Sequence, residues 1–331
     1  MSEALSVLIV GCGNVAGGYD SGPDDSQAPL THAGAYHRHP GFRLAACIEP
    51  DDARRRAFQA RWGVPSGWSC IAQLPAGSRF EVISICSPTP MHLHDVRASL
   101  ALSPRLIFCE KPIAPSSREA AEVVSLCDQA GVPLAVNHTR RWAPDVVNLA
   151  KRLTTGEWGP LRSISGLYNK GVLNNGSHLI DLLHALVGPV EPVAALAPVA
   201  DGMPGDPTVP ALLKAVDTGL PIHLRTAHAA DYAVFELELV MAGGVLCMED
   251  GGFRWRERRA QESPDFPGYR SLGSGSASAG EYRQAMTHAV DNLHSAVVRN
   301  EPLRSTGATA LKAQLVCERI HELSTMGAHH A

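Results

Sequence analysis

The sequence predicts an α/β protein, in which a domain built on a parallel sheet precedes an α+β domain with a largely antiparallel, open sheet. In the first 138 residues short apolar runs alternate with helical patterns, whereas after Arg141 strand-like runs follow one another without intervening helices. Strands buried on both faces of a parallel sheet are continuously apolar, and antiparallel strands alternate. A chain of 331 residues also exceeds the ~250–300 residues at which a single core stops growing. We therefore expect two domains, residues 1–138 and 139–331.

Five apolar, β-branched runs are the predicted strands of the N-terminal domain. They cover residues 6–11, 42–49, 80–88, 106–112 and 133–138, with helical patterns at 51–63, 91–102 and 116–131. This alternation predicts parallel strands with helices on both faces of the sheet.

The C-terminal domain reads as strands followed by two closing helices. Strand-like runs cover 161–168, 190–200, 222–229 and 232–250, and the last of these alternates like a hairpin that turns at Gly243-Gly244. The Ser/Gly-rich stretch 271–280 predicts a flexible loop, and 281–300 and 305–324 predict helices.

Composition excludes several classes of partner. Lys+Arg 29 against Asp+Glu 33 gives a net charge of −4 without a basic block, so a nucleic-acid surface is not expected. The eight cysteines form no CxxC pair, which favours free thiols in a reducing compartment over disulfides or zinc. Neither a signal-peptide pattern nor an apolar run of ~18 residues is present in the sequence. We expect a soluble, cytoplasmic protein without a membrane partner.

A glycine-rich segment, GCGNVAG at residues 11–17, directly follows the first predicted strand. In dinucleotide-binding Rossmann domains the first glycine permits a tight turn, and the second lets the pyrophosphate approach the backbone. The start of the following helix supplies N–H groups to the phosphates. We therefore expect a Rossmann domain in which Gly11, Gly13, Asn14 and Val15 bind a dinucleotide.

Glu49 ends the second strand and predicts the identity of that cofactor. A carboxylate there accepts hydrogen bonds from a ribose 2′-OH and repels a 2′-phosphate, which favours NAD over NADP. Arg54, Arg55 and Arg56 keep NADP open as an alternative, unless they lie on a solvated helix face.

The distance from the glycine-rich segment to Glu49 is unusual. Glu49 lies 32 residues after Gly17, whereas the acidic residue usually follows the glycines by ~20 residues. Residues 18–31 are too polar and too rich in Gly and Pro to continue a helix. We expect an inserted loop over the cofactor cleft, with a helix resuming near Thr31 to His37.

The tripeptide Glu110-Lys111-Pro112 ends the fourth predicted strand, at the edge where α/β sheets bind ligands. A partly desolvated lysine beside a cationic nicotinamide can exchange protons with a substrate. For an isolated Glu-Lys pair the alternative interpretation is a surface ion pair.

A second polar constellation lies in NNGSHLIDLLH, residues 174–184. On a helix His178, Asp181 and His184 fall opposite an apolar arc of leucines, isoleucine and valine. The two histidines are six residues apart, whereas zinc-binding pairs prefer a spacing of four. We therefore predict no metal site, and we expect His184 to take no part.

The order of these motifs resembles that of the Gfo/Idh/MocA oxidoreductase family. GCGNVAG, SPTPMHLHDVRASLA, FCEKPIAPSSREAAEVV, VNHTRRWAP and NNGSHLIDLL match in sequence, and the resemblance runs from about residue 6 to 188. It implies a Rossmann domain joined to a domain whose open sheet helps form a homodimer or homotetramer. It also implies oxidation or reduction of hydroxyls of sugars, sugar nucleotides and cyclitols.

The resemblance also implies roles for single residues. Lys111 matches the lysine that contacts the reacting hydroxyl, and His178 a proton donor or acceptor, with Asp181 as the acid three residues later. On the cofactor side it implies Lys111 again, with Glu110 at a ribose and the loop residues Ser87, Pro88, Thr89 and His92 beneath the nicotinamide. Asn137 and Arg141 match a stretch at the domain junction, which assigns Asn137 to the cofactor and Arg141 to the substrate.

Two departures from the family pattern concern the substrate. Asn174 stands where many members have aspartate, and since an amide cannot accept a proton, an Asp–His relay is absent. Similar asparagine motifs occur in branches that resemble sugar-nucleotide 3-dehydrogenases, so we count Asn174 among the substrate residues. Tyr168 and Lys170 precede the motif, and we count both among the substrate residues. Lys170 is either a ligand for a substrate carboxylate or phosphate, or a surface lysine.

These features together predict an NAD(H)-dependent oxidoreductase acting on a sugar or sugar-nucleotide hydroxyl or ketone. Two alternatives remain within the resemblance: an NAD-dependent glycoside hydrolase that oxidises its substrate transiently, and a non-catalytic NAD-binding regulator. Retention of both Lys111 and His178 argues against the regulator.

Overall fold

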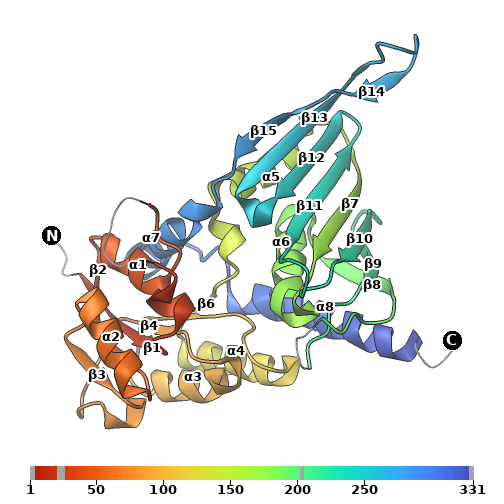
Figure 1. Cartoon of the computed structure of the whole chain (residues 1–331). Coiled ribbons are helices and arrows are strands. Elements are labelled where there is room, and N and C mark those ends of the chain that lie inside the picture. The colour runs from red at the N-terminus through yellow and green to blue at the C-terminus, as the bar shows by residue number, and fades with distance from the viewer. Residues whose placement is uncertain (1–3, 21–26, 202–204, 328–331) are drawn as a thin grey trace. The chain divides into compact units, whose positions relative to one another are not determined.

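The structure is a computed structural model that describes residues 4–20, 27–201 and 205–327 (Figure 1). The chain divides into two compact units, which we call the N-terminal unit (residues 1–143 and 283–311) and the C-terminal unit (residues 144–282 and 312–331). The sequence places the border five residues earlier and leaves 283–311 with the second domain. The α/β fold class is confirmed, with a parallel sheet in one unit and a largely antiparallel sheet in the other.

The N-terminal unit is built on a six-stranded parallel sheet. Its order is β3-β2-β1-β4-β5-β6, the strand order of a Rossmann domain. The strands are β1 (Leu5–Val10), β2 (Phe42–Ile48), β3 (Ser66–Trp68), β4 (Val82–Ile85), β5 (Leu106–Cys109) and β6 (Leu134–Val136). The short β3 has no apolar pattern and was not predicted from the sequence.

Helices cover both faces of this sheet, which explains why its strands are continuously apolar. Val7 and Ile9 of β1 share a core with α1 (His32–Arg38), α2 (Asp52–Trp62) and α7 (Ala285–Arg299). Leu8 and Val10 face the opposite core, to which α3 (His92–Leu100) and α4 (Ser117–Ala130) contribute.

The helix expected after the insertion is confirmed. Thr31 caps α1, because its hydroxyl accepts the N–H of Gly34 at 3.2 Å. Residues 21–26 of the inserted loop lie outside the described residues.

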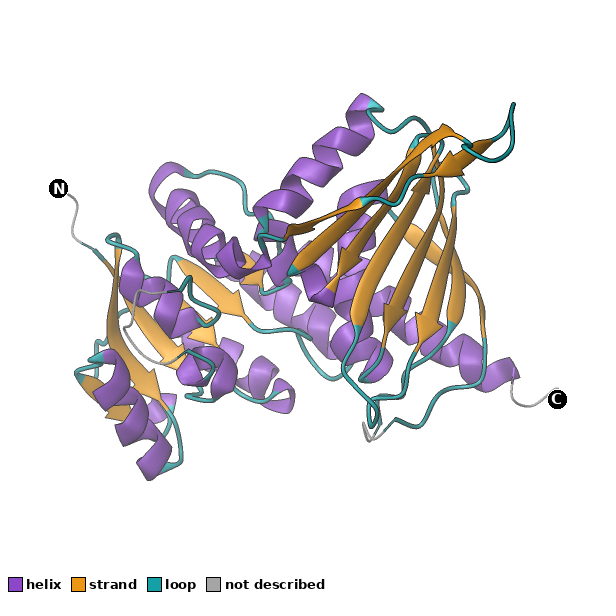
Figure 2. Cartoon of the chain, turned by 45° about the horizontal axis from the view of Figure 1, so that its top comes forward, coloured by secondary structure: helices purple, strands orange, loops and turns teal. Residues whose placement is uncertain are grey.

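The C-terminal unit consists of a large mixed sheet and the helices α5 (Pro144–Thr155), α6 (Ser177–Val187) and most of α8 (Gly307–Gly327) (Figure 2). The strand order is β14-β13-β12-β11-β7-β10-β9-β8, with β15 also paired to β13. Neighbours are antiparallel except β7 and β10, which run parallel. The strands are β7 (Leu161–Tyr168), β8 (Val190–Ala195), β9 (Ala211–Ala215), β10 (Pro221–Thr226), β11 (Phe235–Met241), β12 (Gly244–Glu249), β13 (Arg254–Glu262), β14 (Arg270–Leu272) and β15 (Ser276–Ala279).

The predicted hairpin is present, but its turn lies one residue earlier. Met241 pairs with Gly244, so Ala242 and Gly243 form the turn. The prediction of a flexible loop at 271–280 was wrong, because β14 and β15 both pair with β13 there. These pairings use backbone hydrogen bonds, so an exposed Ser/Gly-rich strand leaves no apolar alternation in the sequence.

None of the helices in the described ranges is long and apolar enough to cross a bilayer. The eight cysteines are free thiols, and of these only Cys70 is exposed.

Candidate cofactor and proton-transfer site

The glycine-rich segment forms the turn after β1. Gly11 has a φ of +89°, and a Cβ on it would lie 2.6 Å from the backbone nitrogen of Ser87. Both the backbone conformation and the close approach of the loop after β4 therefore require glycine here. A Cβ on Gly13 would meet nothing within 4 Å, so the space above this residue is open. The helix that follows is a single π-helical turn, Asn14–Gly18, and is shorter than the fingerprint predicts.

Glu49 directly follows β2 and is held against this turn. Its Oε2 accepts the N–H of Cys12 at 3.0 Å, and its Oε1 accepts the N–H of Asp51 at 3.1 Å. Arg54 lies 3.4 Å from the same Oε1, whereas Arg55 and Arg56 both pair with Asp52 on α2. A cavity of about 250 Å³ borders the turn and is lined by Cys12, Gly13, Asn14, Gly17, Gly18, Arg54, Ala57, Phe58, Arg61 and Trp62.

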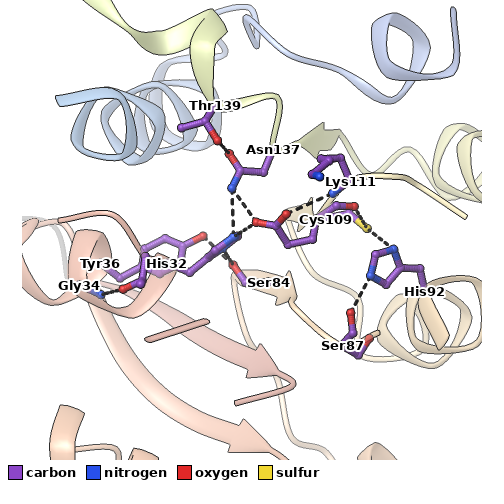
Figure 3. Close-up of polar contacts among 12 residues, drawn as sticks. His32, Gly34, Tyr36, Ser84, Ser87, His92, Cys109, Lys111, Asn137 and Thr139 are labelled. Carbon is purple, nitrogen blue, oxygen red and sulfur yellow. Dashed lines mark hydrogen bonds and ion pairs between the residues drawn. The ribbon is translucent and has the colours of Figure 1, made fainter. Parts of the chain in front are cut away.

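His92 ties together the loops that follow β4 and β5 (Figure 3). Its Nε2 lies 2.9 Å from the carbonyl oxygen of Ser87, and its Nδ1 lies 3.0 Å and 3.2 Å from those of Pro112 and Ile113. The Ser87 hydroxyl donates to Asp95 at 2.6 Å. The predicted loop residues Pro88 and Thr89 begin the short helix Thr89–Met91, directly before α3.

Glu110 follows β5 as a buried carboxylate. Its Oε1 accepts hydrogen bonds from Asn137 Nδ2 at 2.6 Å and from His32 Nε2 at 2.9 Å, and its Oε2 accepts the N–H of Lys111 at 3.3 Å. Burial raises the pKa of Glu110, but the hydrogen bonds from His32 and Asn137 outweigh burial and lower it below its ordinary value. Lys111 is thus anchored by Glu110 on one side and, through the following Pro112, by His92 on the other. The Lys111–Pro112 peptide is cis.

His32 is the residue of this group that the sequence did not reveal. It is fully buried on α1, its ring lies 4.5 Å from that of Phe108, and its Nδ1 lies 3.4 Å from the hydroxyl of Ser84. Ser84 in turn lies 2.9 Å from the hydroxyl of Tyr36 (Figure 3). Small residues follow His32 in the sequence (Ala33, Gly34 and Ala35), and nothing beside it specifies a carboxylate partner.

Two predicted residues follow β6. The side-chain oxygen of Asn137 accepts the hydroxyl of Thr139 at 3.0 Å, so its amide is oriented towards Glu110. Arg141 lies in the short helix Thr139–Trp142, and its Nη1 donates to the carbonyl oxygen of Arg304 at 3.4 Å, within the same unit.

The C-terminal unit contains the predicted substrate residues other than Arg141. His178 is half-buried in the first turn of α6, with its ring edge-on to Phe235 at 6.4 Å, and Asp181 is buried one turn later. Asn174 belongs to the π-helical turn Gly171–Gly176 before α6. Its amide side chain donates to the carbonyl oxygen of Lys170 at 3.0 Å, and Lys170 itself adopts a left-handed conformation with a φ of +65°. A left-handed non-glycine residue beside a π-helical turn is a kind of local strain often found at binding sites.

Tyr168 is placed differently from the other substrate candidates. It is fully buried at the end of β7, where its hydroxyl donates to the carbonyl oxygen of Val209 at 2.7 Å and accepts the N–H of Val209 at 3.1 Å. Burial raises the pKa of this phenol. Its hydroxyl is therefore engaged inside the C-terminal unit.

The structure thus brings the predicted cofactor residues together at one edge of one sheet. The glycine turn, Glu49, the Ser87 loop, Lys111 and Asn137 all follow the carboxyl ends of parallel strands. Of the residues predicted to contact the substrate, the C-terminal unit contains His178, Asp181, Asn174, Lys170 and Tyr168. Across both groups, as far as the structure describes the chain, no three His, Cys, Asp or Glu side chains are arranged to hold a metal ion.

Comparison with known proteins agrees with this arrangement. The profile of the GFO_IDH_MocA family, described as "Oxidoreductase family, NAD-binding Rossmann fold", matches residues 5–138. The N-terminal domain belongs to the Gfo/Idh/MocA family. The matched segment contains the glycine turn, Glu49, the Ser87 loop and Lys111.

Individual curated relatives share a low sequence identity with the chain. The chain is 24% identical to a D-apiose dehydrogenase of Paraburkholderia graminis, over 64% of this chain and 62% of that protein. It is 25% identical to a D-glucoside 3-dehydrogenase of Escherichia coli (56% and 53%) and 29% identical to an inositol 2-dehydrogenase of Corynebacterium glutamicum (51% and 46%). The aligned part thus spans about half to three-fifths of the length of these relatives.

Solved structures share the fold over nearly the whole chain. One is an oxidoreductase from Agrobacterium radiobacter in complex with NAD+, L-tartaric acid and magnesium, with a TM-score of 0.77, 17% identity and 98% and 97% of the two chains covered. Another is the WlbA dehydrogenase from Bordetella pertussis in complex with NADH and UDP-GlcNAcA, with a TM-score of 0.75, 16% identity and 98% of each chain covered. The fold of the chain is therefore shared with these two solved oxidoreductases over nearly its whole length.

Proposed function

We propose that this chain is an NAD(H)-dependent oxidoreductase that transfers hydride between nicotinamide and a hydroxyl or ketone of a sugar or sugar nucleotide. The observation that carries the proposal is the position of Lys111. It lies in a turn anchored on both sides, by Glu110 and through Pro112 by His92, at the same sheet edge as the glycine turn. Ligands of open α/β sheets bind at the carboxyl ends of the strands.

The N-terminal unit has the features that a dinucleotide needs. The close contact between Gly11 and Ser87 fixes the turn, the open space above Gly13 leaves room for a pyrophosphate, and Glu49 places a carboxylate beside the turn. NAD, when bound, supplies the hydride acceptor for the reaction. Because Glu49 is an acid, we propose NAD over NADP as the cofactor.

Proton transfer is assigned to this chain's own side chains. The amine of Lys111 takes the hydroxyl proton in oxidation and returns it in reduction, as a general base and acid. We propose that His178 is the second proton-handling group, and that Asp181, Asn174, Lys170 and Arg141 belong to the substrate side. The amide of Asn174 cannot relay a proton, so we assign proton transfer to Lys111 and His178.

The substrate class rests on the named relatives. The enzymes compared above act, by their names, on D-apiose, a D-glucoside and inositol, which are all polyhydroxylated. We propose a sugar, cyclitol or sugar nucleotide as substrate, and a cytoplasmic homo-oligomer formed through the open sheet of the C-terminal unit.

A substrate screen with two lysine variants tests the proposal. The purified chain is incubated with sugars, cyclitols and sugar nucleotides and with NAD+ or NADP+, and NADH formation is followed by absorbance. Lys111→Met removes the general base, so turnover should fall by ~10²–10⁴-fold while calorimetry shows unchanged NAD binding. Lys151→Met, at an exposed lysine on α5, should leave both quantities unchanged.

Other results would redirect the assignment. An active Lys111→Met variant would overturn the role of Lys111. Cleavage of glycosides without net NADH formation would indicate the hydrolase, and NAD binding without turnover of any polyol would indicate the regulator.

A further inference from the structure

We propose that His32 is a positioning residue, fixed behind Glu110 by the contacts between Asp20 and Thr31 at the start of α1, so that the Lys111 turn is held for proton transfer. This inference rests on the proposed function for its catalytic consequence. The coupling of His32 to Glu110 can be measured without any substrate.

Four buried side chains form one directed chain of hydrogen bonds. Glu110 is an ionised acceptor, so the proton between it and His32 belongs to Nε2 of the imidazole. In that tautomer Nδ1 is an acceptor and faces the hydroxyl of Ser84, which in turn accepts from the phenol of Tyr36. Burial raises the pKa of Tyr36, so the phenol stays a donor. Every donor from Tyr36 to His32 therefore points towards Glu110.

The two oxygens of Glu110 therefore accept hydrogen bonds from different donors. Oε1 takes the two side-chain donors, His32 at 2.9 Å and Asn137 at 2.6 Å, and Oε2 is left facing the N–H of Lys111. Without His32 one of the two side-chain donors to a buried carboxylate is lost. Such a group rotates or takes up a proton, because a buried charge with too few partners is costly.

Asp20 fixes the start of the helix that carries His32. The carboxylate of Asp20 accepts the N–H of Leu30 and of Thr31, both at 3.0 Å, and the Thr31 hydroxyl at 2.5 Å. Asp20 thus ties the start of the inserted segment to the N-cap of α1, one residue before His32. A Cβ on Gly34 would lie 2.3 Å from the carboxylate of Asp20, so this clamp also requires glycine in the first turn of α1.

Two variants of His32 test the proposal, with His37→Leu, an exposed histidine on the same helix, as control. His32→Leu should lower kcat about tenfold to a hundredfold, because small misplacements of a catalytic group cost up to ~10²-fold. The KM for NAD should change less than about threefold, since Glu49 and the glycine turn are untouched. His32→Gln keeps an N–H donor and should recover most of the loss.

A second readout is independent of turnover. The carboxyl carbon of Glu110, labelled with ¹³C and assigned through Glu110→Gln, is titrated by NMR in wild type and variants. The other titratable or charged groups around it are Lys111 and the thiols of Cys86 and Cys109, which are the same in every protein compared. The titration midpoint of Glu110 should move upwards in His32→Leu and stay unchanged in His37→Leu.

The two readouts separate the two proposals. An upward midpoint with lowered kcat and rescue by His32→Gln supports the positioning role. An unchanged midpoint or an unchanged kcat in His32→Leu overturns it. If wild type turns over no polyol, the proposed function fails and the catalytic consequence fails with it, whereas the midpoint shift still decides whether His32 controls Glu110.

Discussion

The carboxylate of Glu49 accepts the backbone N–H of Cys12 at 3.0 Å, so the acid that follows β2 is fastened to the turn that follows β1. The two residues lie 37 positions apart, and the whole inserted segment lies between them. The contact keeps a negative charge beside the glycine turn, and no residue of the inserted segment takes part in it. We therefore expect Glu49 to set cofactor choice, whereas Asp20 and Thr31 fix the start of the helix whose His32 contacts Glu110.

Replacing Glu49 with glutamine should relax cofactor choice. The amide removes the charge that repels a 2′-phosphate, and Arg54, 3.4 Å from Oε1 in the wild type, becomes available to pair with one. We expect the ratio of kcat/KM for NADP+ to that for NAD+ to rise about tenfold, which corresponds to ~1.4 kcal/mol. Asp52→Asn on the exposed part of α2 is the matched control. An unchanged ratio would show that Glu49 is only structural.

Alanine substitutions at the two glycines of the turn should affect different quantities: Gly11→Ala the stability of the fold, and Gly13→Ala the binding of NAD. Gly11→Ala forces a left-handed alanine and a contact of 2.6 Å with Ser87, so the free energy of unfolding should drop by about 1–3 kcal/mol. Gly13→Ala meets no atom within 4 Å, so its stability should be unchanged while the Kd for NAD rises at least about tenfold, because the methyl group occupies the space of the pyrophosphate. Urea unfolding and calorimetry measure the two quantities. Normal NAD affinity in Gly13→Ala would place the pyrophosphate elsewhere.

The sequence predicts this edge of the sheet well because its signals are local. A strand followed by GCGNVAG, and a strand followed by Glu110-Lys111-Pro112, each specify their own position at a strand end. Parallel strands then bring those ends to one edge without further information. The end of the Gly/Pro-rich stretch likewise predicted a helix from near Thr31, and in the structure the Thr31 hydroxyl caps α1.

Contacts between distant segments could not be predicted in this way. His32 meets Glu110 across 78 residues, and nothing near His32 in the sequence specifies a carboxylate partner. Tyr168 precedes the substrate motif directly, yet its hydroxyl bonds to Val209, 41 residues further on. The charged strand β13 was missed for a related reason, since its backbone pairing is independent of the polar side chains that dominate its sequence.

His92 should contribute to stability as well as to the site. Its ring reaches three carbonyl oxygens, those of Ser87, Pro112 and Ile113, and it is 1% exposed. His92→Leu leaves these buried acceptors without the ring, at a cost of about 2–3 kcal/mol in the free energy of unfolding. His94→Leu, two residues on and largely exposed, should cost less than about 0.5 kcal/mol. Equal effects of the two variants in urea unfolding would contradict the bridging role.

Glu110 should make stability depend on acid pH. Its pKa in the folded protein lies below the ordinary value of 4.5, so the unfolded chain binds the proton more readily. The stabilisation is therefore complete above pH 4.5 and is lost as the pH falls through the folded-state pKa. Glu110→Gln cannot ionise, and at pH 7 it should be less stable than wild type by about 1–3 kcal/mol, the worth of hydrogen bonds to a charged group. Urea unfolding between pH 7 and pH 3 should show this difference shrinking at the acid end, whereas Glu122→Gln, an exposed glutamate on α4, should show no such trend. A difference that stays constant down to pH 3 would mean that the pKa of Glu110 is the same in the folded and the unfolded chain. If wild type instead gains stability relative to Glu110→Gln as the pH falls, Glu110 keeps its proton in the folded protein, and the donor chain from Tyr36 through His32 would then need the opposite direction.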